Sequence, residues 1–294
     1  MILGETALST ESYMDEVISS EEIRKLKASA NRVRIKIIKM LTEAGSGHPG
    51  GSLSVTDILV ALYFHIMRYD PSDPCWKGRD RLVLSKGHSV PALYAVLSEV
   101  GYIKDEDLLT VRKWGSKLQG HPDRLLTRGI EMSTGSLGQG MSIATGMAIG
   151  AKIDKSEIRV YVVCSDGEHQ SGMTWEAVMS AAKHKLDNLT AFIDNNGMQI
   201  DGPTDQIMPV MPLREKYLAF NWNVIEADGH DFKSLIWAAT QALNYKGKPT
   251  VVICKTIKGK GVSFMENKVN WHGKAPQSEE AALALKELEE MEKE

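Results

Sequence analysis

Two polar side chains follow short apolar runs in the middle of the chain, and their types suit a metal ion beside a phosphate. Asp166 and Gly167 come after the run 159–164 (RVYVVC), and Asn196 follows the run 190–194 (TAFID). A carboxylate, an amide oxygen and a nearby backbone carbonyl are hard oxygen ligands, which Mg²⁺ supplements with phosphate oxygens and water. Gly167 lets the backbone approach a phosphate, and a helix N-terminus after it favours an anion. An Asp-Gly turn alone is weak evidence, because such turns end many strands that bind nothing.

Four histidines stand beside glycine at widely separated positions, namely His48, His88, His121 and His272. Imidazole donates hydrogen bonds to phosphate oxygens, contacts sugar hydroxyls and relays protons near neutral pH. No two of the four have the close spacing of a zinc motif such as HExxH. Phosphate and hydroxyl recognition is therefore the favoured interpretation. His65 and His184 fall within predicted helices, where a structural role is the simpler interpretation.

A glycine-rich run at 133–140 (STGSLGQG) leads into an apolar helical segment. Its glycines fall as GxxGxG, which matches only loosely the GxGxxG of dinucleotide-binding sites. No strand clearly precedes it, and no acidic residue ends a strand about 20 residues further on. Close approach of the backbone to a flat ring, or tight helix packing, is favoured over a dinucleotide site.

These residues require a framework that positions them, and the hydrophobic pattern predicts an α/β fold. Runs rich in β-branched residues predict strands near 81–85, 159–164, 190–194, 223–227 and 250–255. Helical periodicity covers about 21–43, 54–67, 91–100, 136–152, 172–186, 231–244 and 278–293. This alternation predicts a parallel sheet with helices on both faces, which binds ligands at the carboxyl ends of its strands. Asp166 and Asn196 are then expected at that edge, on neighbouring strands.

Composition excludes several classes of function. The 294 residues carry a net charge of −3 with acids and bases well mixed, which argues against binding to nucleic acid or a membrane surface. Cys75, Cys164 and Cys254 form no CxxC pair and are typical of reduced thiols in the cytosol. The N-terminus lacks the basic and apolar regions of a secretory signal, and no apolar run reaches the about 20 residues that span a bilayer. We therefore expect a cytoplasmic protein.

In combination these motifs resemble the N-terminal, diphosphate-binding domain of transketolases. The resemblance covers nearly all of residues 20–276, in family order. It is carried by SGHPGGSLS (46–54), RDRLVLSKGHSVPALY (79–94), LQGHPD (118–123), STGSLGQGMSIATGMA (133–148), SDGEHQSGMTWEA (165–177), DNNGMQIDG (194–202), DGHD (228–231) and KTIKGKGVSFMENKVNWHGKAP (255–276). The SDGE…NN pair is shared by many thiamine-diphosphate enzymes, whereas the histidine set and TGSLGQG are far more specific to transketolases.

The resemblance implies thiamine diphosphate and Mg²⁺ as cofactors, with Ca²⁺ or Mn²⁺ able to replace Mg²⁺. Asp166 and Asn196 would bind the metal by their side chains, and Met198 by its carbonyl. The diphosphate would be held by Gly167, His88 and His272. The fold implied is the thiamine-diphosphate-binding fold of transketolase diphosphate (PP) domains, a parallel α/β sheet.

The resemblance also implies contacts to the rest of the cofactor and to the sugar. Gly135 and Leu137 would line the aminopyrimidine ring, with Ile200 wedged against the cofactor. Three histidines would face the sugar, contact its hydroxyls and assist proton transfer, namely His48, His121 and His272. His48 would contact the cofactor as well.

The sequence departs from the family in three places. SDG stands where GDG is usual, and Ser136 stands where a proline is common. The chain also stops near the end of the first domain, so residues 1–294 are expected to form one domain, with an N-terminal extension over 1–20 and a C-terminal helix over 277–294. Full-length transketolases continue into a pyrimidine-binding domain, which supplies the activating glutamate and most sugar-phosphate arginines. Glu168 belongs to the diphosphate motif and is not that glutamate.

We therefore expect the N-terminal subunit of a split transketolase, active with a separate C-terminal, pyrimidine-domain subunit in an α2β2 assembly. The implied reaction transfers a two-carbon ketol unit from a ketose phosphate to an aldose phosphate, as in the pentose phosphate pathway. A deoxyxylulose-phosphate synthase or a 2-oxoacid dehydrogenase component shares the metal motif, but the histidines disfavour both. A transketolase for an unusual sugar and a non-catalytic module that binds cofactor or a partner stay open as alternatives.

Overall fold

Five parallel strands form the centre of the molecule. The structure is a computed structural model and describes residues 18–291. The strands are β1 (Arg81–Leu84), β2 (Val160–Ser165), β3 (Leu189–Asn195), β4 (Asn223–Asp228) and β5 (Thr250–Lys255). They are arranged in the order β1-β2-β3-β5-β4, and every neighbouring pair is parallel. The carboxyl ends of all five therefore lie at one edge, and the predicted strands agree with the observed ones to within one residue.

The central strands are apolar throughout because both faces of the sheet are covered. Residues 160–164 of β2 and 189–194 of β3 are all buried. Strands of this kind form near-continuous Val, Ile and Leu runs, without the alternation of a half-exposed strand. β4 lies at the sheet edge and is mostly part-exposed.

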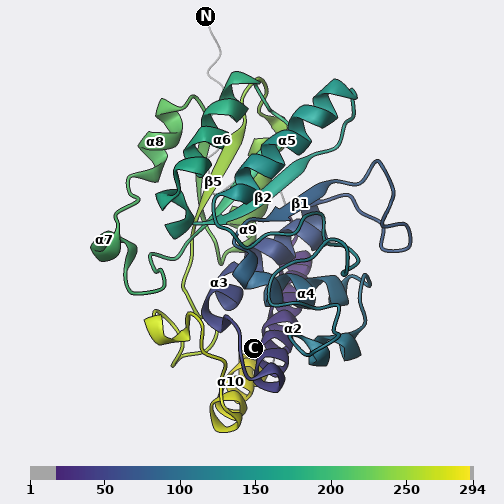
Figure 1. The fold of residues 1–294 in the computed structure, drawn as a ribbon, viewed down its shortest axis with the longest axis vertical. Helices are drawn as coiled ribbons and strands as arrows, with labels where there is room; N and C mark the ends of the chain where they lie inside the picture. Colours follow the sequence, from purple (N-terminus) through teal and green to yellow (C-terminus); the bar gives the residue numbers. More distant parts are fainter. Residues whose placement is uncertain (1–17, 292–294) are drawn as a thin grey trace, which may run out of the picture.

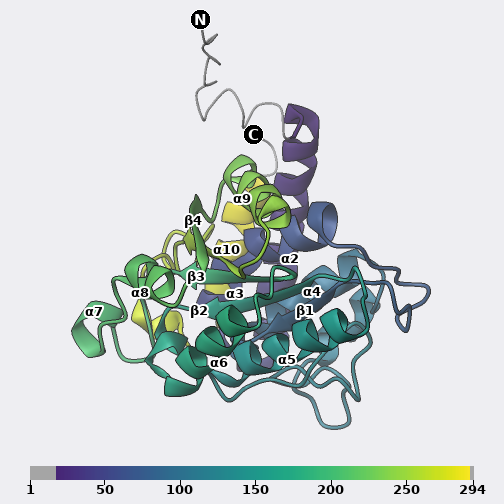
Figure 2. The same ribbon diagram turned by 90° about the horizontal axis from the view of Figure 1, so that it is seen from above.

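Helices cover both faces of the sheet, as Figures 1 and 2 show. One face packs against α2 (Ser20–Ala44), α3 (Pro49–Ala61), α4 (Val90–Glu99), α9 (Phe232–Asn244) and α10 (Ser278–Met291). The other packs against α5 (Gln139–Ile153), α6 (Gly172–Lys183) and α8 (Leu213–Ala219). The remaining elements are short: α7 (Thr204–Ile207), a π-turn over Leu62–Ile66, and 3₁₀ turns over Gly87–Ser89, Asp105–Thr110, Gly167–Gln170 and Val269–Trp271. In the described part of the chain, no helix combines the length and the apolar character that crossing a membrane requires.

The helix α3 begins at Pro49, five residues earlier than the predicted helix over 54–67. Proline is favoured in the first helical turn because it has no N–H, while an N–H there would find no partner within the helix. The helix continues through Gly50 and Gly51. Glycine fits these two positions because their surroundings leave no room for a side chain. A Cβ at Gly50 would lie 2.8 Å from the carbonyl oxygen of Trp271, and one at Gly51 would lie 2.9 Å from Ser89 Oγ.

Three smaller expectations also need correction. His65 lies in the π-turn that follows α3, and His184 is the residue just after α6, so neither stands inside a regular α-helix. The helix predicted from 136 begins at Gln139. The short helices α7 and α8 were not predicted, because seven residues or fewer give too little periodicity to recognise.

The C-terminal helix packs on its own domain. In α10, Ala281, Ala284 and Leu288 are buried against the core that includes α2. The Nδ2 amide of Asn31 on α2 also donates a hydrogen bond of 2.7 Å to the carbonyl oxygen of Leu288. The predicted N-terminal extension falls almost entirely outside the described residues.

Two leucines of α10 offer a matched test of this packing. Leu288 is fully buried, whereas Leu283 on the same helix is 59% exposed. We expect Leu288→Ala to destabilise the protein by about 2–5 kcal/mol, because it removes buried methyl groups and leaves a cavity. Leu283→Ala should stay within about 0.5 kcal/mol. Urea unfolding followed by circular dichroism measures both, and equal midpoints for the two variants would contradict this packing.

Candidate active site

The carboxyl ends of β2 and β3 bring the three predicted metal-binding residues together. Asp166 Oδ1 accepts the N–H of Gly167 at 2.7 Å, and its Oδ2 accepts the N–H of Gly197 at 2.6 Å. The second bond fastens the loop after β3 to the end of β2. In that loop Asn196 Oδ1 accepts the N–H of Met198 at 3.0 Å. Asp166 and the loop that carries Asn196 and Met198 thus lie together at the sheet edge.

Asp166 lies in an environment that disfavours its negative charge. Burial, together with the nearby charge of Asp194, raises the pKa of Asp166 to about 6, although the two backbone N–H groups act to lower it. A cation next to this carboxylate would relieve that penalty. Among residues 18–291, no group of three or more His, Cys, Asp or Glu side chains could hold a metal alone. The predicted set contains one carboxylate, so it fits an ion that takes its other ligands from phosphate and water.

Four distant segments bring the predicted histidines into one cluster. His48 precedes α3, His88 lies in the 3₁₀ turn after β1, His121 lies in the segment before α5, and His272 follows the turn Val269–Trp271. The ring centroid of His48 is 5.3 Å from that of His88, 5.5 Å from that of His272 and 6.4 Å from that of His121. The rings of His88 and His272 stack at 5.4 Å.

The clustered imidazoles are held in their neutral form. Burial, and then the charge of Arg112, lowers the pKa of His48 to about 4. Burial, and then the charge of Lys258, lowers the pKa of His272 to about 3. The pKa of His88 is well below its ordinary value and that of His121 is also lowered, in both cases chiefly by burial. Each ring therefore keeps one donor and one acceptor nitrogen at neutral pH.

A buried lysine belongs to the cluster, and the sequence reasoning missed it. Lys258 is 1% exposed, and its Nζ lies 2.7 Å from Nδ1 of His272. Since an ammonium only donates, Nδ1 of His272 accepts, and its ring proton is on Nε2. Burial and the nearby Lys86 lower the pKa of Lys258 to about 8. The one signal in the sequence was its position shortly after the predicted strand 250–255, within KTIKGKG. This signal is weak, because lysines are rarely buried and a lysine at a strand end is expected to be exposed.

The glycine-rich run packs beside the histidines. A Cβ at Gly135 would lie 3.2 Å from Cδ2 of His121, so the backbone passes close to that ring. The N–H of Gly138 donates to Oε1 of Glu168 at 2.7 Å, which ties the run to the motif after β2. Leu137 is 40% exposed and Ile200 is 64% exposed. These two apolar side chains, predicted to contact the cofactor, are available for a further contact.

A buried ion pair connects the two halves of the site. The ammonium of Lys86 pairs with Asp194 and donates to the carbonyl oxygen of Gly51 at 3.2 Å. Ser54 on α3 donates to Asp194 Oδ1 at 2.5 Å and accepts from Asn196 Nδ2 at 3.1 Å. The network runs from the turn that carries His88 to the loop that carries Asn196, and the sequence pattern alone assigns it no role.

Unpaired polar atoms support an anionic ligand in this position. His48 Nδ1, Ser89 Oγ and Gln199 Nε2 are buried with no hydrogen-bond partner among the described residues. Buried polar groups are normally paired, so such atoms call for a partner from outside the chain. With Lys258, the neutral imidazoles and the close backbone at Gly51 and Gly167, they fit a diphosphate group.

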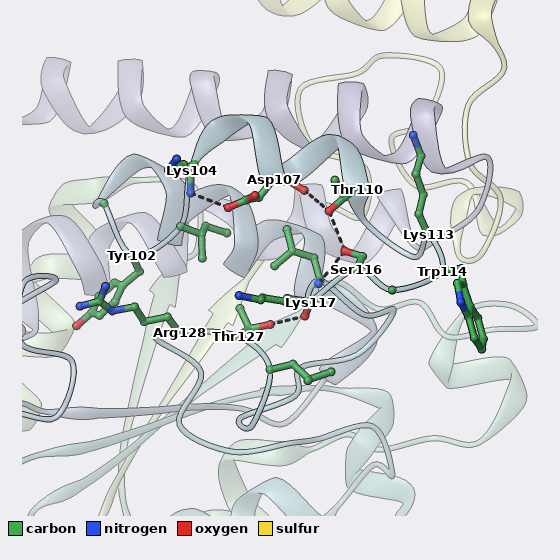
Figure 3. A pocket seen from close by; sticks show the side chains of 15 residues that line it. Tyr102, Lys104, Asp107, Thr110, Lys113, Trp114, Ser116, Lys117, Thr127 and Arg128 are labelled. Atoms are coloured by element: carbon green, nitrogen blue, oxygen red, sulfur yellow. Dashed lines mark hydrogen bonds between the residues drawn. The ribbon is translucent and has the colours of Figure 1, made fainter.

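A separate hollow of 790 Å³ lies away from these residues (Figure 3). Its walls come from residues 101–128 and include the cations Lys104, Lys113, Lys117 and Arg128. Trp114 is fully exposed at its rim. None of the four clustered histidines, Asp166 or Asn196 lines it.

Geometry and charge thus define an α/β domain with a buried polar site, suited to an anion, at the carboxyl edge of its sheet. A sequence profile of the family "Transketolase, thiamine diphosphate binding domain" matches residues 25–292. The chain belongs to this transketolase family.

Relatives of two lengths are similar to the chain. The 6-deoxy-6-sulfo-D-fructose transketolase subunit SqwG of Clostridium sp. (strain MSTE9) is 46% identical over 92% of this chain and 98% of its own length. An apulose-4-phosphate transketolase subunit of Actinobacillus succinogenes is 41% identical over 93% of this chain and 98% of its own length. The crystal structure of transketolase from Campylobacter jejuni superposes with a TM-score of 0.85 at 34% identity, covering 90% of this chain. The chain spans only 42% of that longer protein.

The lowered pKa of Lys258 predicts proton uptake when an anion binds. At pH 8 about half of a group with a pKa of about 8 is deprotonated. A bound diphosphate favours the charged ammonium and raises this pKa, so binding should take up roughly half a proton per chain. Calorimetric titration with thiamine diphosphate and Mg²⁺, in two buffers of different ionisation enthalpy, measures this uptake. The contribution of Lys258 should shrink at pH 7, and proton release at pH 8 would contradict the assignment.

Proposed function

We propose that this chain is the thiamine-diphosphate-holding subunit of a two-subunit transketolase, which transfers a two-carbon ketol unit from a ketose phosphate to an aldose phosphate. The observation that carries the proposal is the meeting of four histidines and Lys258 at the sheet edge that holds Asp166 and Asn196. Relatives named as transketolase subunits match over nearly all of their own length, which supports a subunit of this size.

Different residues of the chain would bind the metal ion and the diphosphate. Mg²⁺ would be bound by Asp166, Asn196 and the Met198 carbonyl, an oxygen set that leaves room for phosphate and water. The diphosphate would be held by His88, His272, Lys258 and the backbone at Gly167. When bound, thiamine diphosphate supplies an electron sink for cleavage of the bond next to a ketose carbonyl.

The histidines then act on the sugar. His48 and His121 are neutral, so each can donate to one hydroxyl and accept from another. With Nδ1 of His272 accepting from Lys258, its Nε2 proton is available to a ligand oxygen. Such groups orient the sugar and can hold or pass a proton as hydroxyl and carbonyl interconvert.

A second subunit would complete the site. Leu137 and Ile200 are partly exposed, which suits a cofactor ring contacted from this side by one chain and from the other side by another. We propose that this partner is a C-terminal, pyrimidine-domain subunit, in an α2β2 assembly in the cytoplasm. Xylulose 5-phosphate, with which a transketolase of Pichia stipitis has been crystallised, and other intermediates of the pentose phosphate pathway are the first substrates to consider.

Two relatives favour an unusual sugar as a second candidate. They are named for 6-deoxy-6-sulfo-D-fructose and for apulose 4-phosphate, and at 46% and 41% identity both match the chain over its described domain. The histidine cluster contacts features that all of these ketoses share, a carbonyl and neighbouring hydroxyls. Discrimination at the far end of the sugar would then lie mainly with the partner subunit.

A reconstituted assay tests the function. The chain, its C-terminal partner, thiamine diphosphate and Mg²⁺ are mixed with each of the three ketoses and an aldose phosphate acceptor, and the released aldose is measured. We expect activity only when both subunits are present. Asp166→Ala and His272→Ala should each reduce kcat/KM by at least about 100-fold, the range seen when positioned catalytic groups are removed.

His184→Ala serves as the matched control, because this histidine is exposed at the end of α6. Its activity should equal that of the unmodified chain. Absence of activity with all three ketoses, while the partner is shown to be bound, would leave the binding module as the better proposal.

The raised pKa of Asp166 predicts how the proposed Mg²⁺ site responds to pH. An acid with a pKa of about 6 is mostly protonated below pH 6, and a protonated carboxyl is a poor metal ligand. Mg²⁺ affinity, measured with thiamine diphosphate present, should therefore fall about tenfold for each pH unit below 6. Asp166→Asn should bind Mg²⁺ more weakly and depend less on pH, since titration of the cofactor is common to both proteins. Parallel pH profiles for the two would exclude Asp166 as a ligand.

A further inference from the structure

His230, in the DGHD stretch at the end of β4, joins Asp57 and Arg34 in a side-chain triad that the proposed function leaves without a role. Nδ1 of His230 lies 2.6 Å from Oδ2 of Asp57 on α3. Arg34 on α2 donates to both oxygens of the same carboxylate, at 3.1 and 2.6 Å. Asp57 and Arg34 are 4% and 6% exposed, whereas His230 is part-buried, and all three line a hollow of 560 Å³.

The hydrogen bonds of His230 fix its tautomer. Its Nε2 lies 2.8 Å from the backbone nitrogen of Ile257, and a backbone N–H can only donate. Nε2 is therefore the unprotonated nitrogen, and Nδ1 carries the proton that is donated to Asp57. The imidazole thus joins a carboxylate on α3 to the main chain just after β5 (Thr250–Lys255).

Arg34 makes a second attachment to the same segment. Its Nε donates to the carbonyl oxygen of Lys260 at 3.1 Å. The triad therefore forms hydrogen bonds to the backbone at Ile257 and at Lys260, on either side of Lys258. Between these points the N–H of Gly259 donates to the carbonyl oxygen of Gly50 at 2.9 Å.

The electrostatics of the triad favour a fixed arrangement. Burial alone would raise the pKa of Asp57, but the charge of Arg34 and the hydrogen bonds from His230 and Arg34 lower it below its ordinary value. The carboxylate is thus ionised and accepts three hydrogen bonds. Removing one partner from a buried, charged network of this kind leaves a polar group unsatisfied, so the arrangement has few alternatives.

We propose that His230, Asp57 and Arg34 are positioning residues that fix the segment 257–260 and thereby aim Lys258 and His272 at the diphosphate. None of the three belongs to the histidine cluster; His230 and Arg34 bind the backbone on either side of Lys258, and Asp57 holds both of them. Lys258 Nζ contacts His272 Nδ1, so a displacement of the segment moves both ligand-binding groups. The inference rests on the proposed function for the identity of the anion, whereas the attachment of the segment is independent of it.

Three variants of the full chain test the role of His230. His230→Ala removes both hydrogen bonds. His230→Gln keeps a neutral side chain that can accept from Ile257 and donate to Asp57. His184→Ala is the control, since it removes an exposed histidine from the end of α6.

Hydrogen–deuterium exchange measures the attachment without any ligand, and calorimetry measures affinity for thiamine diphosphate with Mg²⁺. We expect His230→Ala to speed exchange over residues 257–272 and to weaken affinity roughly 3- to 10-fold, the effect of one lost hydrogen bond. His230→Gln should restore both quantities, and His184→Ala should change neither.

The outcomes separate this inference from the proposed function. Unchanged exchange over 257–272 in His230→Ala would overturn the positioning role. If His230→Ala does not fold, the glutamine variant decides, because a folded His230→Gln protein with weak affinity and rapid exchange in this segment would also overturn it. If the unmodified chain binds no thiamine diphosphate even with its partner subunit present, the proposed function fails, and the exchange comparison alone decides the attachment.

Discussion

The site depends on one buried ion pair, between Lys86 after β1 and Asp194 near the end of β3. Both side chains are almost completely buried, at 1% and 0% exposure. Burial acts to raise the pKa of Asp194, but the charge of Lys86 and hydrogen bonds from Lys86, Ser54 and Thr256 lower it. These partners come from the end of β1, from α3 and from the segment after β5, so the carboxylate joins the elements that carry the site. Breaking such a pair leaves an uncompensated charge in the interior, which costs about 3–5 kcal/mol.

The same pair explains the electrostatics of its surroundings. Lys86 is one of the charges that lower the pKa of His48, His88 and His272, and it is the first neighbouring charge that lowers the pKa of Lys258. The negative charge of Asp194, in contrast, raises the pKa of Asp166. One pair of opposite charges thus helps to keep imidazoles neutral on one side and makes a carboxylate receptive to a cation on the other.

The sequence was sufficient for the fold because the strands are buried on both faces and give unmistakable apolar runs. It was also sufficient to place Asp166 and Asn196 together, since a right-handed crossover leaves few arrangements for one βαβ unit. The convergence of four histidines came from a family resemblance and not from spacing, because the segments before α3, after β1 and after β5 meet only in three dimensions. Lys258 and His230 were missed for the same reason: burial of a lysine and the partners of a histidine are tertiary facts. The early start of α3 was missed because Gly50 and Gly51 look like turn residues, although they are there to admit Trp271 and Ser89.

The unpaired and buried polar groups of the site carry a cost to the stability of the free chain, which a ligand of matching charge would relieve. The buried Lys258, unpaired polar atoms on His48 and Gln199, and an aspartate with a raised pKa all disfavour the folded chain in isolation. A diphosphate with a divalent cation carries the charges of both signs that these groups lack. A ligand that binds only the folded state stabilises it, and a ligand here would gain free energy by relieving penalties that the free chain already carries. Binding by Lys258 then requires that the segment 257–260 is rigidly attached. If the segment were mobile, the Lys258 ammonium would turn towards water and lose its desolvation penalty without any ligand.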